Sequence, residues 1–312
     1  MDSLLSGLRA AGEPTRLRLL ALCAHGELSV SELTQILSQS QPRVSRHLKL
    51  LEEAGLLERF REGALVFYRI AERSEPAVLA RTLVDLLPSD SVELNRDLTR
   101  LENIRKKRAD LAEAYFNDNA SQWNQIRRMH VAETEVEQHL LGLIGRSKIE
   151  SYLDIGTGTG RILALMAKHV EHGLGIDKSS EMLALARIQL EQEGLKNVSV
   201  RKGDMYSMPL DDNCVDLATI HLVLHYAHEP HLVINEAART LREDGRLLIV
   251  DFAPHQEEHL RTEHNHQRLG FSDKEIRQRL NEAGLKPGKT HSLAGDPLTV
   301  KIWQATHRGA VH

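Results

Sequence analysis

The chain has 312 residues, of which 41% are hydrophobic and 27% charged, and its formal net charge is -4. This length allows about two domains with separate cores, and the composition is that of an ordinary globular protein. No apolar run approaches the roughly 20 residues of a membrane helix, and Met1-Asp2-Ser3 does not open a signal peptide, so we expect a cytoplasmic protein outside the membrane.

Two amphipathic helices are predicted at the start of the chain. Leucines mark the first helix around residues 4–8 and the second around 17–22, and residues 12–15 separate them, with Glu13 or Thr15 near the second helix start. A short helix over residues 29–37 follows, with apolar residues on one face. The turn Ser38-Gln39-Ser40 then leads into another helix.

That next helix, residues 41–51, has a basic outer face. Val44, Leu48 and Leu51 share an inner face by their i, i+4, i+7 spacing, and Ser40 or Gln41 can cap the helix. A short helix, a tight turn and a basic second helix predict a helix-turn-helix. The predicted DNA-binding residues are Ser40, Gln41, Arg43, Ser45, Arg46, His47 and Lys49, together with Arg61.

Arg61 belongs to a predicted hairpin that follows this helix. Strands over residues 57–60 and 66–70 flank the residues Arg61-Glu62-Gly63-Ala64. This hairpin would be the wing of a winged helix-turn-helix domain that spans residues 1–73.

Residues 13–17 and 40–56 resemble ArsR-type winged-helix repressors. The resemblance implies binding to double-stranded operator DNA as a homodimer. Metal-sensing members carry two cysteines where this chain has Ser29 and Ser31, and others use histidines after the wing, where this chain has none between His47 and His130. We therefore predict no metal site in this domain.

Residues 74–114 are predicted to form a helical linker and dimerisation segment. Pro88 interrupts it, and Ser89 or Asp90 would cap the helix that follows. The linker also carries apolar positions that are interrupted by polar residues; they are Leu94, Leu98, Leu101, Ile104 and Leu111. The basic run at 105–108 could contact phosphate, but a solvated helix face is the favoured interpretation.

A glycine loop organises the remainder of the chain. Residues 151–155 are typical of a buried parallel strand, and residues 161–168 of the helix that follows it. Between them, Gly156, Gly158 and Gly160 permit backbone angles closed to other residues and let a ligand approach the main chain. The helix start would direct free N–H groups at that ligand.

Three further strands are predicted to end in polar residues. Asp177 ends the second strand, where a ribose diol would need an acceptor, and Asp204 and Met205 follow the third, where they would meet an adenine. A fourth strand leads into His221, and a fifth covers residues 247–252. The spacing of the glycines differs from the G-x-G-x-x-G of dinucleotide-binding enzymes.

From Tyr115 to the end, these motifs resemble class I S-adenosylmethionine-dependent methyltransferases. The resemblance implies a Rossmann-like domain over residues 115–312 with an antiparallel sheet edge, binding S-adenosyl-L-methionine or S-adenosyl-L-homocysteine. The chain is thus expected to be α/β, with an all-helical winged helix-turn-helix domain, a helical linker and the methyltransferase domain. The implied cofactor-binding residues are Tyr115, Asp154, Gly156, Thr157, Gly158, Gly160, Asp177, Lys178, Met182, Asp204, Met205 and His221.

Histidines are concentrated between residues 221 and 266. Residues 255–259 fit the H-x-x-E-H string of zinc peptidases, but that motif needs a long helix in another fold. The default interpretation is solvated loop histidines, with His221 and His225 lining the pocket as candidate bases. A ligand site for a metal or an acidic methyl acceptor stays open as an alternative, and no metal ligands are assigned.

The leading hypothesis is a transcriptional regulator fused to a methyltransferase of unknown methyl acceptor. A first alternative is a repressor that senses the nucleoside without transferring a methyl group. A second is a small-molecule methyltransferase whose winged helix serves dimerisation alone.

Overall fold

The computed structural model describes residues 1–62, 65–71, 75–108, 132–145 and 149–307. The chain divides into two compact units, Met1–Leu111 and Ala112–His312. The predicted linker therefore belongs to the first unit over most of its length. Leu111, Tyr115 and the residues of the predicted cofactor cover around them lie outside the described residues.

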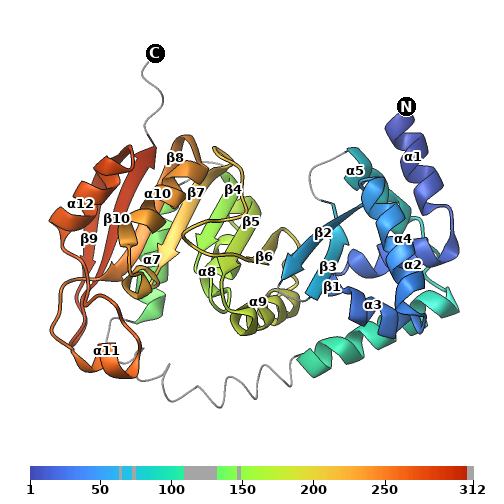
Figure 1. The fold of residues 1–312 in the computed structure, drawn as a ribbon, viewed down its shortest axis with the longest axis horizontal. Coiled ribbons are helices and arrows are strands. Elements are labelled where there is room, and N and C mark those ends of the chain that lie inside the picture. Colours follow the sequence, from blue (N-terminus) through green and yellow to red (C-terminus); the bar gives the residue numbers. More distant parts are fainter. Residues whose placement is uncertain (63–64, 72–74, 109–131, 146–148, 308–312) are drawn as a thin grey trace. The chain divides into compact units, whose positions relative to one another are not determined.

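The first unit is built around a helix-turn-helix (Figure 1). Its labelled elements are α1 (Asp2–Ala11), α2 (Pro14–Cys23), β1 (Leu28–Ser29), α3 (Val30–Leu37), α4 (Gln41–Glu53), β2 (Leu57–Glu62), β3 (Leu65–Ile70) and α5 (Glu75–Asp85). Glu13 caps α2 by accepting a hydrogen bond from the Arg16 N–H at 2.9 Å. Ser29 and Glu32 form a capping box at α3, whereas Ser40 precedes α4 without a side-chain cap bond. The inner faces of these helices meet in one core that includes Leu33, Val44 and Leu48.

The wing is wider than a hairpin. β2 and β3 pair antiparallel, and β1 adds a third strand by pairing Leu28 with Tyr68 and Ser29 with Phe67. The sheet order is β1-β3-β2. The domain is therefore not all-helical: the pair β2–β3 is the predicted wing, and β1 is an additional strand because the two residues before α3 are extended and pair with β3.

The linker helix covers residues 92–108 and packs on its own unit. Ser91 caps it, accepting from the Leu94 N–H at 3.4 Å, so the expected caps Ser89 and Asp90 are one or two residues early. Leu101 and Ile104 are 2% and 6% exposed and join the core of the first unit. These two side chains are thus buried within the chain, and Asp97, paired with Arg18 at 2.6 Å, is buried beside them.

The second unit is a sheet between two helical layers (Figure 1). Its strands are β4 (Ile149–Ile155), β5 (Val170–Asp177), β6 (Val198–Lys202), β7 (Val215–His221), β8 (Leu241–Phe252), β9 (Leu285–Leu293) and β10 (Val300–His307). The order is β6-β5-β4-β7-β8-β10-β9, parallel up to β8, with β10 antiparallel to both its neighbours. This confirms the predicted parallel sheet with an antiparallel edge.

Two cores cover the two faces of this sheet. The helices are α7 (Glu133–Ile144), α8 (Arg161–Met166), α9 (Ser180–Gln192), α10 (Pro230–Thr240), α11 (His259–Glu263) and α12 (Asp273–Glu282), with the 3-10 turn η1 (Leu224–Tyr226). Side chains of α7, α8 and α9 share one core, and those of α10 and α12 share the other. Within the described residues, no helix is long and apolar enough to cross a membrane.

Candidate functional site

The glycine loop connects β4 to α8 as the sequence predicts. Gly156, Gly158 and Gly160 have φ angles of 70°, 53° and 80°, in the left-handed region that other residues avoid. A Cβ on Gly156 would lie 2.6 Å from the Val223 side chain, so a larger residue would also clash. The N–H groups of Gly156 and Thr157 bond the Ile176 carbonyl at 2.8 and 2.9 Å, which fixes the loop to β5.

Asp154 stabilises the glycine loop through buried hydrogen bonds. It is 2% exposed, and its two carboxylate oxygens accept hydrogen bonds from the Thr157 and Thr219 hydroxyls, both at 2.7 Å. The Thr219 hydroxyl also bonds the Tyr152 hydroxyl at 2.6 Å. Burial raises the pKa of the Asp154 carboxyl, and the two threonine hydroxyls oppose that rise. Asp154 thus shapes the loop through its neighbours.

Asp177 and Asp204 occupy the adjacent strand ends. The Asp177 carboxylate accepts from the Gly158 and Ser179 N–H groups, both at 2.8 Å, and so joins β5 to the glycine loop. Asp204 accepts from the Tyr206 N–H at 3.1 Å, and its other oxygen lies 3.5 Å from the Lys178 ammonium. Each carboxylate oxygen can accept a further bond. The first turn of α9 carries the partly buried Met182, and Met205 packs beside the second core.

A cavity of about 150 Å³ adjoins the glycine loop. Of the residues expected at the cofactor, Asp154, Gly156, Thr157 and His221 line it. The other lining residues are Glu133, Glu137, Arg161, Ile162 and Leu222. Two charged groups on α7 and one on α8 are therefore part of this site.

Arg161, the first residue of α8, was not expected there. It pairs with Glu133 at 2.6 Å and with Glu137, which lie one turn apart on α7. The sequence did contain a signal, because glutamates at i and i+4 share a helix face and Arg161 directly follows the loop. The sequence did not, however, indicate that α7 packs on α8.

The two candidate bases lie in different surroundings. His221 ends β7 and faces the cavity, whereas His225 lies on η1 and is 2% exposed. The His225 Nδ1 lies 2.9 Å from a carboxylate oxygen of Asp251, which is fully buried at the end of β8. Because a carboxylate only accepts, Nδ1 must donate, and the lone pair of the neutral ring is then on Nε2. No motif in the sequence indicated Asp251.

The basic face of α4 is exposed in the first unit. Gln41, Arg43, Arg46 and Lys49 are exposed and Ser45 is half-buried, as predicted, and Arg61 is exposed on β2. A hollow of about 700 Å³ lies between α4 and the wing. Its lining includes Gln41, Ser45 and Lys49 on α4 and Arg59 on β2, but also Glu52 and Glu53 at the end of α4.

His47 departs from the expected outward direction. Its ring lies 3.6 Å from the Glu13 carboxylate, and the side chain is 14% exposed. Burial lowers the pKa of the imidazole; Glu13 opposes that shift, while Arg16, Arg43 and Arg46 add to it. His47 therefore packs beside the α2 cap instead of extending from the basic face.

Comparison with protein families identifies both parts of the chain. Residues 13–59 match the family described as "Bacterial regulatory protein, arsR family", and residues 146–285 match "Methyltransferase domain". The chain therefore carries an ArsR-family helix-turn-helix followed by a methyltransferase domain, which confirms the two resemblances and the α/β fold class.

Individual relatives match one part or the other. The chain is 33% identical over 103 residues to "Uncharacterized methyltransferase YcgJ" of Bacillus subtilis, covering 33% of this chain and 41% of that protein. It is 48% identical over 63 residues to "Arsenic resistance transcriptional regulator ArsR1" of Pseudomonas putida, covering 20% of this chain and 49% of the regulator. The chain thus spans less than half the length of each.

A solved structure shares the fold of the second unit. The crystal structure of geranyl diphosphate C-methyltransferase from Streptomyces coelicolor, with Mg²⁺, geranyl diphosphate and S-adenosyl-L-homocysteine, has a TM-score of 0.50. The match covers 56% of this chain and 79% of that one at 14% identity. At 14% identity, the match shows only that the two proteins share a fold.

Proposed function

We propose that this protein is a cytoplasmic DNA-binding transcriptional regulator whose methyltransferase domain uses S-adenosyl-L-methionine. The observation that carries the proposal is the presence of two sets of residues in one chain. One is the exposed cationic face of α4, and the other is the glycine loop with carboxylates at the neighbouring strand ends.

The residues around the glycine loop fit the parts of S-adenosyl-L-methionine. Asp177 would hold the ribose hydroxyls, and Asp204 the adenine amino group, because both carboxylates retain acceptor capacity. A Cβ on Gly158 would meet nothing within 4 Å, so the loop backbone is accessible at this residue to the methionine part. Arg161 and the two glutamates of α7 offer both signs of charge for an amino-acid group. When bound, the nucleoside supplies an activated methyl group.

Methyl transfer is an in-line displacement, so positioning does most of the catalysis. Where the methyl acceptor must lose a proton, His225 is the favoured base over His221, since Asp251 fixes its tautomer.

The first unit would bind operator DNA as a homodimer. Arg43, Arg46 and Lys49 are exposed cations that can meet phosphates or base edges in a major groove. The linker helix buries Leu101 and Ile104 within its own unit, but α1 exposes Leu4, Leu5 and Leu8 at 46%, 42% and 43%. These leucines recur on one side of α1, so the partner subunit would pack there instead.

Two experiments separate this function from its alternatives. Footprinting the DNA upstream of the gene with purified protein should show a protected inverted repeat, and incubation with methyl-labelled S-adenosyl-L-methionine should release S-adenosyl-L-homocysteine once an acceptor is present. A footprint without turnover would favour a repressor that senses the nucleoside. Turnover without any footprint would favour a methyltransferase whose winged helix serves dimerisation alone.

A further inference from the structure

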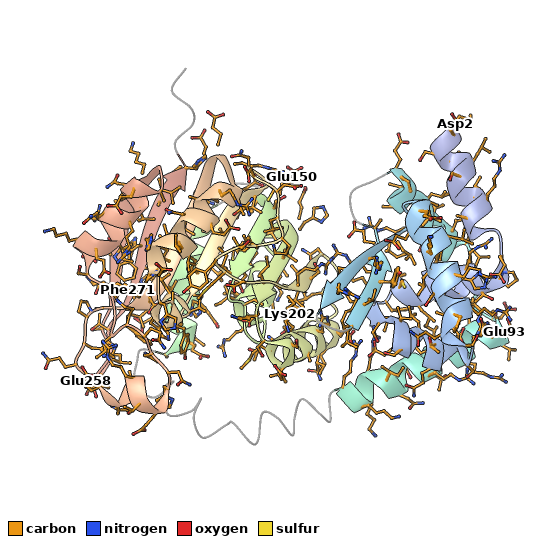
Figure 2. The ribbon with its side chains drawn as sticks, in the orientation of Figure 1. Asp2, Glu93, Glu150, Lys202, Glu258 and Phe271 are labelled. Carbon is orange, nitrogen blue, oxygen red and sulfur yellow. The ribbon has the colours of Figure 1, made fainter. Side chains whose placement is uncertain are left out.

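Five histidine side chains gather beyond the ends of β7 and β8. They are His225, His255, His259, His264 and His266, called here the histidine cluster. The rings of His225 and His266 stack with centroids 4.1 Å apart, and those of His259 and His264 are 6.5 Å apart. All except His225 come from the segment between β8 and α12, in which Figure 2 labels Glu258 and Phe271.

The main chain holds this segment against η1. The N–H groups of Gln267 and Arg268 bond the His225 carbonyl at 2.9 and 3.1 Å. Gly270 has a φ of 80°, and a Cβ there would lie 2.0 Å from the Ala253 carbonyl oxygen, so the turn back toward α12 requires glycine. The histidine cluster is therefore a built feature of the fold, with His264 and His266 8% and 2% exposed.

Several ring nitrogens of the cluster are buried without a hydrogen-bond partner in the described part of the chain. They are Nε2 of His255, Nε2 of His264 and both ring nitrogens of His266. Buried polar atoms almost always have a partner, so such a concentration indicates a site for a hydrogen-bonding ligand. The His255 Nδ1 accepts from the Glu257 N–H at 3.3 Å, which leaves its Nε2 as a donor.

The cluster is close to the proposed methyl-donor site. Val223 precedes η1 and packs against Gly156 of the glycine loop, where a Cβ would be 2.6 Å from it. Leu222 lines the cavity, and its N–H bonds the Val250 carbonyl at 2.8 Å, next to Asp251. The cluster thus continues from the wall of the cavity, on the side away from Asp177 and Asp204.

The environment of the histidine cluster favours an uncharged ligand with an aromatic ring. Burial and then the neighbouring histidines lower the pKa of His266 to about 3, so its ring is neutral at pH 7. Nearby Arg268 is paired with Glu275 at 2.6 Å. Tyr226 and Phe252 line the His266 ring at centroid distances of 5.2 and 6.1 Å. Aromatic walls that carry a small number of placed hydrogen-bonding groups are typical of sites for planar organic molecules.

We propose that the histidine cluster is the methyl-acceptor site and that its acceptor is an uncharged phenol. This rests on the proposed methyltransferase function. The base His225 indicates an acceptor that must lose a proton, and a phenol combines a planar ring, no charge and an acidic hydroxyl. Asp251 would act as a positioning residue through His225.

The proposed reaction transfers the methyl group to the phenol oxygen in one displacement step. His225 Nε2 takes the hydroxyl proton while the oxygen lone pair forms a bond to the methyl carbon. The bond from that carbon to the sulfonium breaks, and its electron pair stays on sulfur as a neutral thioether. The products are an aryl methyl ether, S-adenosyl-L-homocysteine and an imidazolium that releases its proton to solvent.

Binding can be tested on the full-length protein saturated with S-adenosyl-L-homocysteine, which cannot transfer a methyl group. Calorimetry with p-cresol, catechol and 2-naphthol should detect at least one ligand, and p-toluate, an anion of similar size to p-cresol, should not bind. His266→Phe keeps a ring but removes both nitrogens, so it should weaken the phenol at least 10-fold and leave the nucleoside affinity unchanged. His228→Phe, at an exposed position three residues after His225, is the matched control and should change neither.

Turnover with the bound phenol then separates positioning from binding. Asp251→Asn should lower kcat while KM for the phenol stays within about twofold, and His225→Gln should abolish turnover with binding retained. Failure of all three phenols to bind would overturn the proposal, whether or not p-toluate or Zn²⁺ binds in their place, as would unchanged phenol affinity in His266→Phe. If the nucleoside itself fails to bind, the proposed function fails instead, so the two failures are distinguishable.

Discussion

Arg108 donates two hydrogen bonds to the carboxylate of Glu32, from Nε at 2.8 Å and from Nη2 at 2.7 Å. Glu32 is also the capping-box partner of Ser29 at the start of α3. Burial raises the pKa of Glu32, but Arg108 and the bonds from Ser29 outweigh it, and the pKa is below its ordinary value. Arg108, the last described residue of the linker helix, therefore attaches that helix to the first helix of the helix-turn-helix, and Arg105 adds a bond to the His25 carbonyl. The basic run is not simply a solvated face, because two of its members are used within the unit.

This attachment leads us to expect that nucleoside and operator binding are coupled. The chain continues from residue 108 to the second unit, and we expect a change at the proposed nucleoside site to be transmitted to α3 along this connection. Coupling between sites is reciprocal and is typically about 1–3 kcal/mol, which corresponds to roughly a 5- to 150-fold change in operator affinity. Operator titrations of the protein alone, with S-adenosyl-L-methionine and with S-adenosyl-L-homocysteine would measure it. Three identical isotherms would mean that the domains act independently.

Replacing Arg108 should reduce the coupling between nucleoside binding and operator binding. Arg108→Gln loses the bidentate pair and should lower the unfolding free energy of the first unit by about 1–3 kcal/mol, since the bonds are charged and partly buried. The operator affinity should then depend less on the nucleoside. Lys107→Gln removes an exposed charge next to it and should preserve the nucleoside effect. Urea unfolding and the same titrations test both variants, and a nucleoside effect that persists in Arg108→Gln would exclude this route.

Asp177→Ala should weaken S-adenosyl-L-methionine and S-adenosyl-L-homocysteine to a similar extent. The ribose is common to both, and loss of a carboxylate acceptor for it should cost about 1.5–3 kcal/mol. Some of the loss would reflect the released Gly158 and Ser179 N–H groups, so Asp177→Asn, which keeps an acceptor, should retain more affinity. Calorimetry with each nucleoside measures the effect, and equal affinity in wild type and Asp177→Ala would remove Asp177 from the site.

Arg46→Ala should reduce specific operator affinity by about 1–3 kcal/mol if Arg46 reads a base edge. The operator should be an inverted repeat whose half-sites are roughly 34 Å apart, because a twofold dimer places its helices in successive major grooves. Arg81→Ala on α5 removes an exposed charge outside α4 and should have little effect. Footprinting and sedimentation test this, and a monomer bound to a site without dyad symmetry would contradict it.

Acidification should destabilise the second unit through the histidine cluster. The pKa of His266 is lowered from 6.5 to about 3 in the folded protein, so below pH 6.5 the unfolded state takes up a proton that the folded state does not. Stability then falls as pH falls, by up to about 1.4 kcal/mol per pH unit, or about 2 kcal/mol between pH 7 and pH 5. His266→Phe should show a smaller loss over this range. Urea unfolding at pH 7 and pH 5 compares them, and parallel losses in both proteins would rule out the contribution from His266.

The sequence by itself determined the helix-turn-helix, the parallel sheet and the glycine loop. These features depend on local properties: Val44, Leu48 and Leu51 repeat with the helical period, and the left-handed angles at Gly156, Gly158 and Gly160 require glycine. The ends of parallel strands share one sheet edge, so the proximity of Asp177 to the loop also followed from strand order.

Only the tertiary structure decided which side chains meet across elements. Asp251 contacts His225, Arg161 contacts α7, and Arg108 contacts Glu32 because helices and strands far apart in sequence pack at particular angles. The same packing turned His47 toward Glu13 and buried His225, His264 and His266, which the composition of a polar segment had suggested would be solvated. Burial and pairing of polar groups are properties of the whole packed unit, and the periodicity of one segment does not specify them.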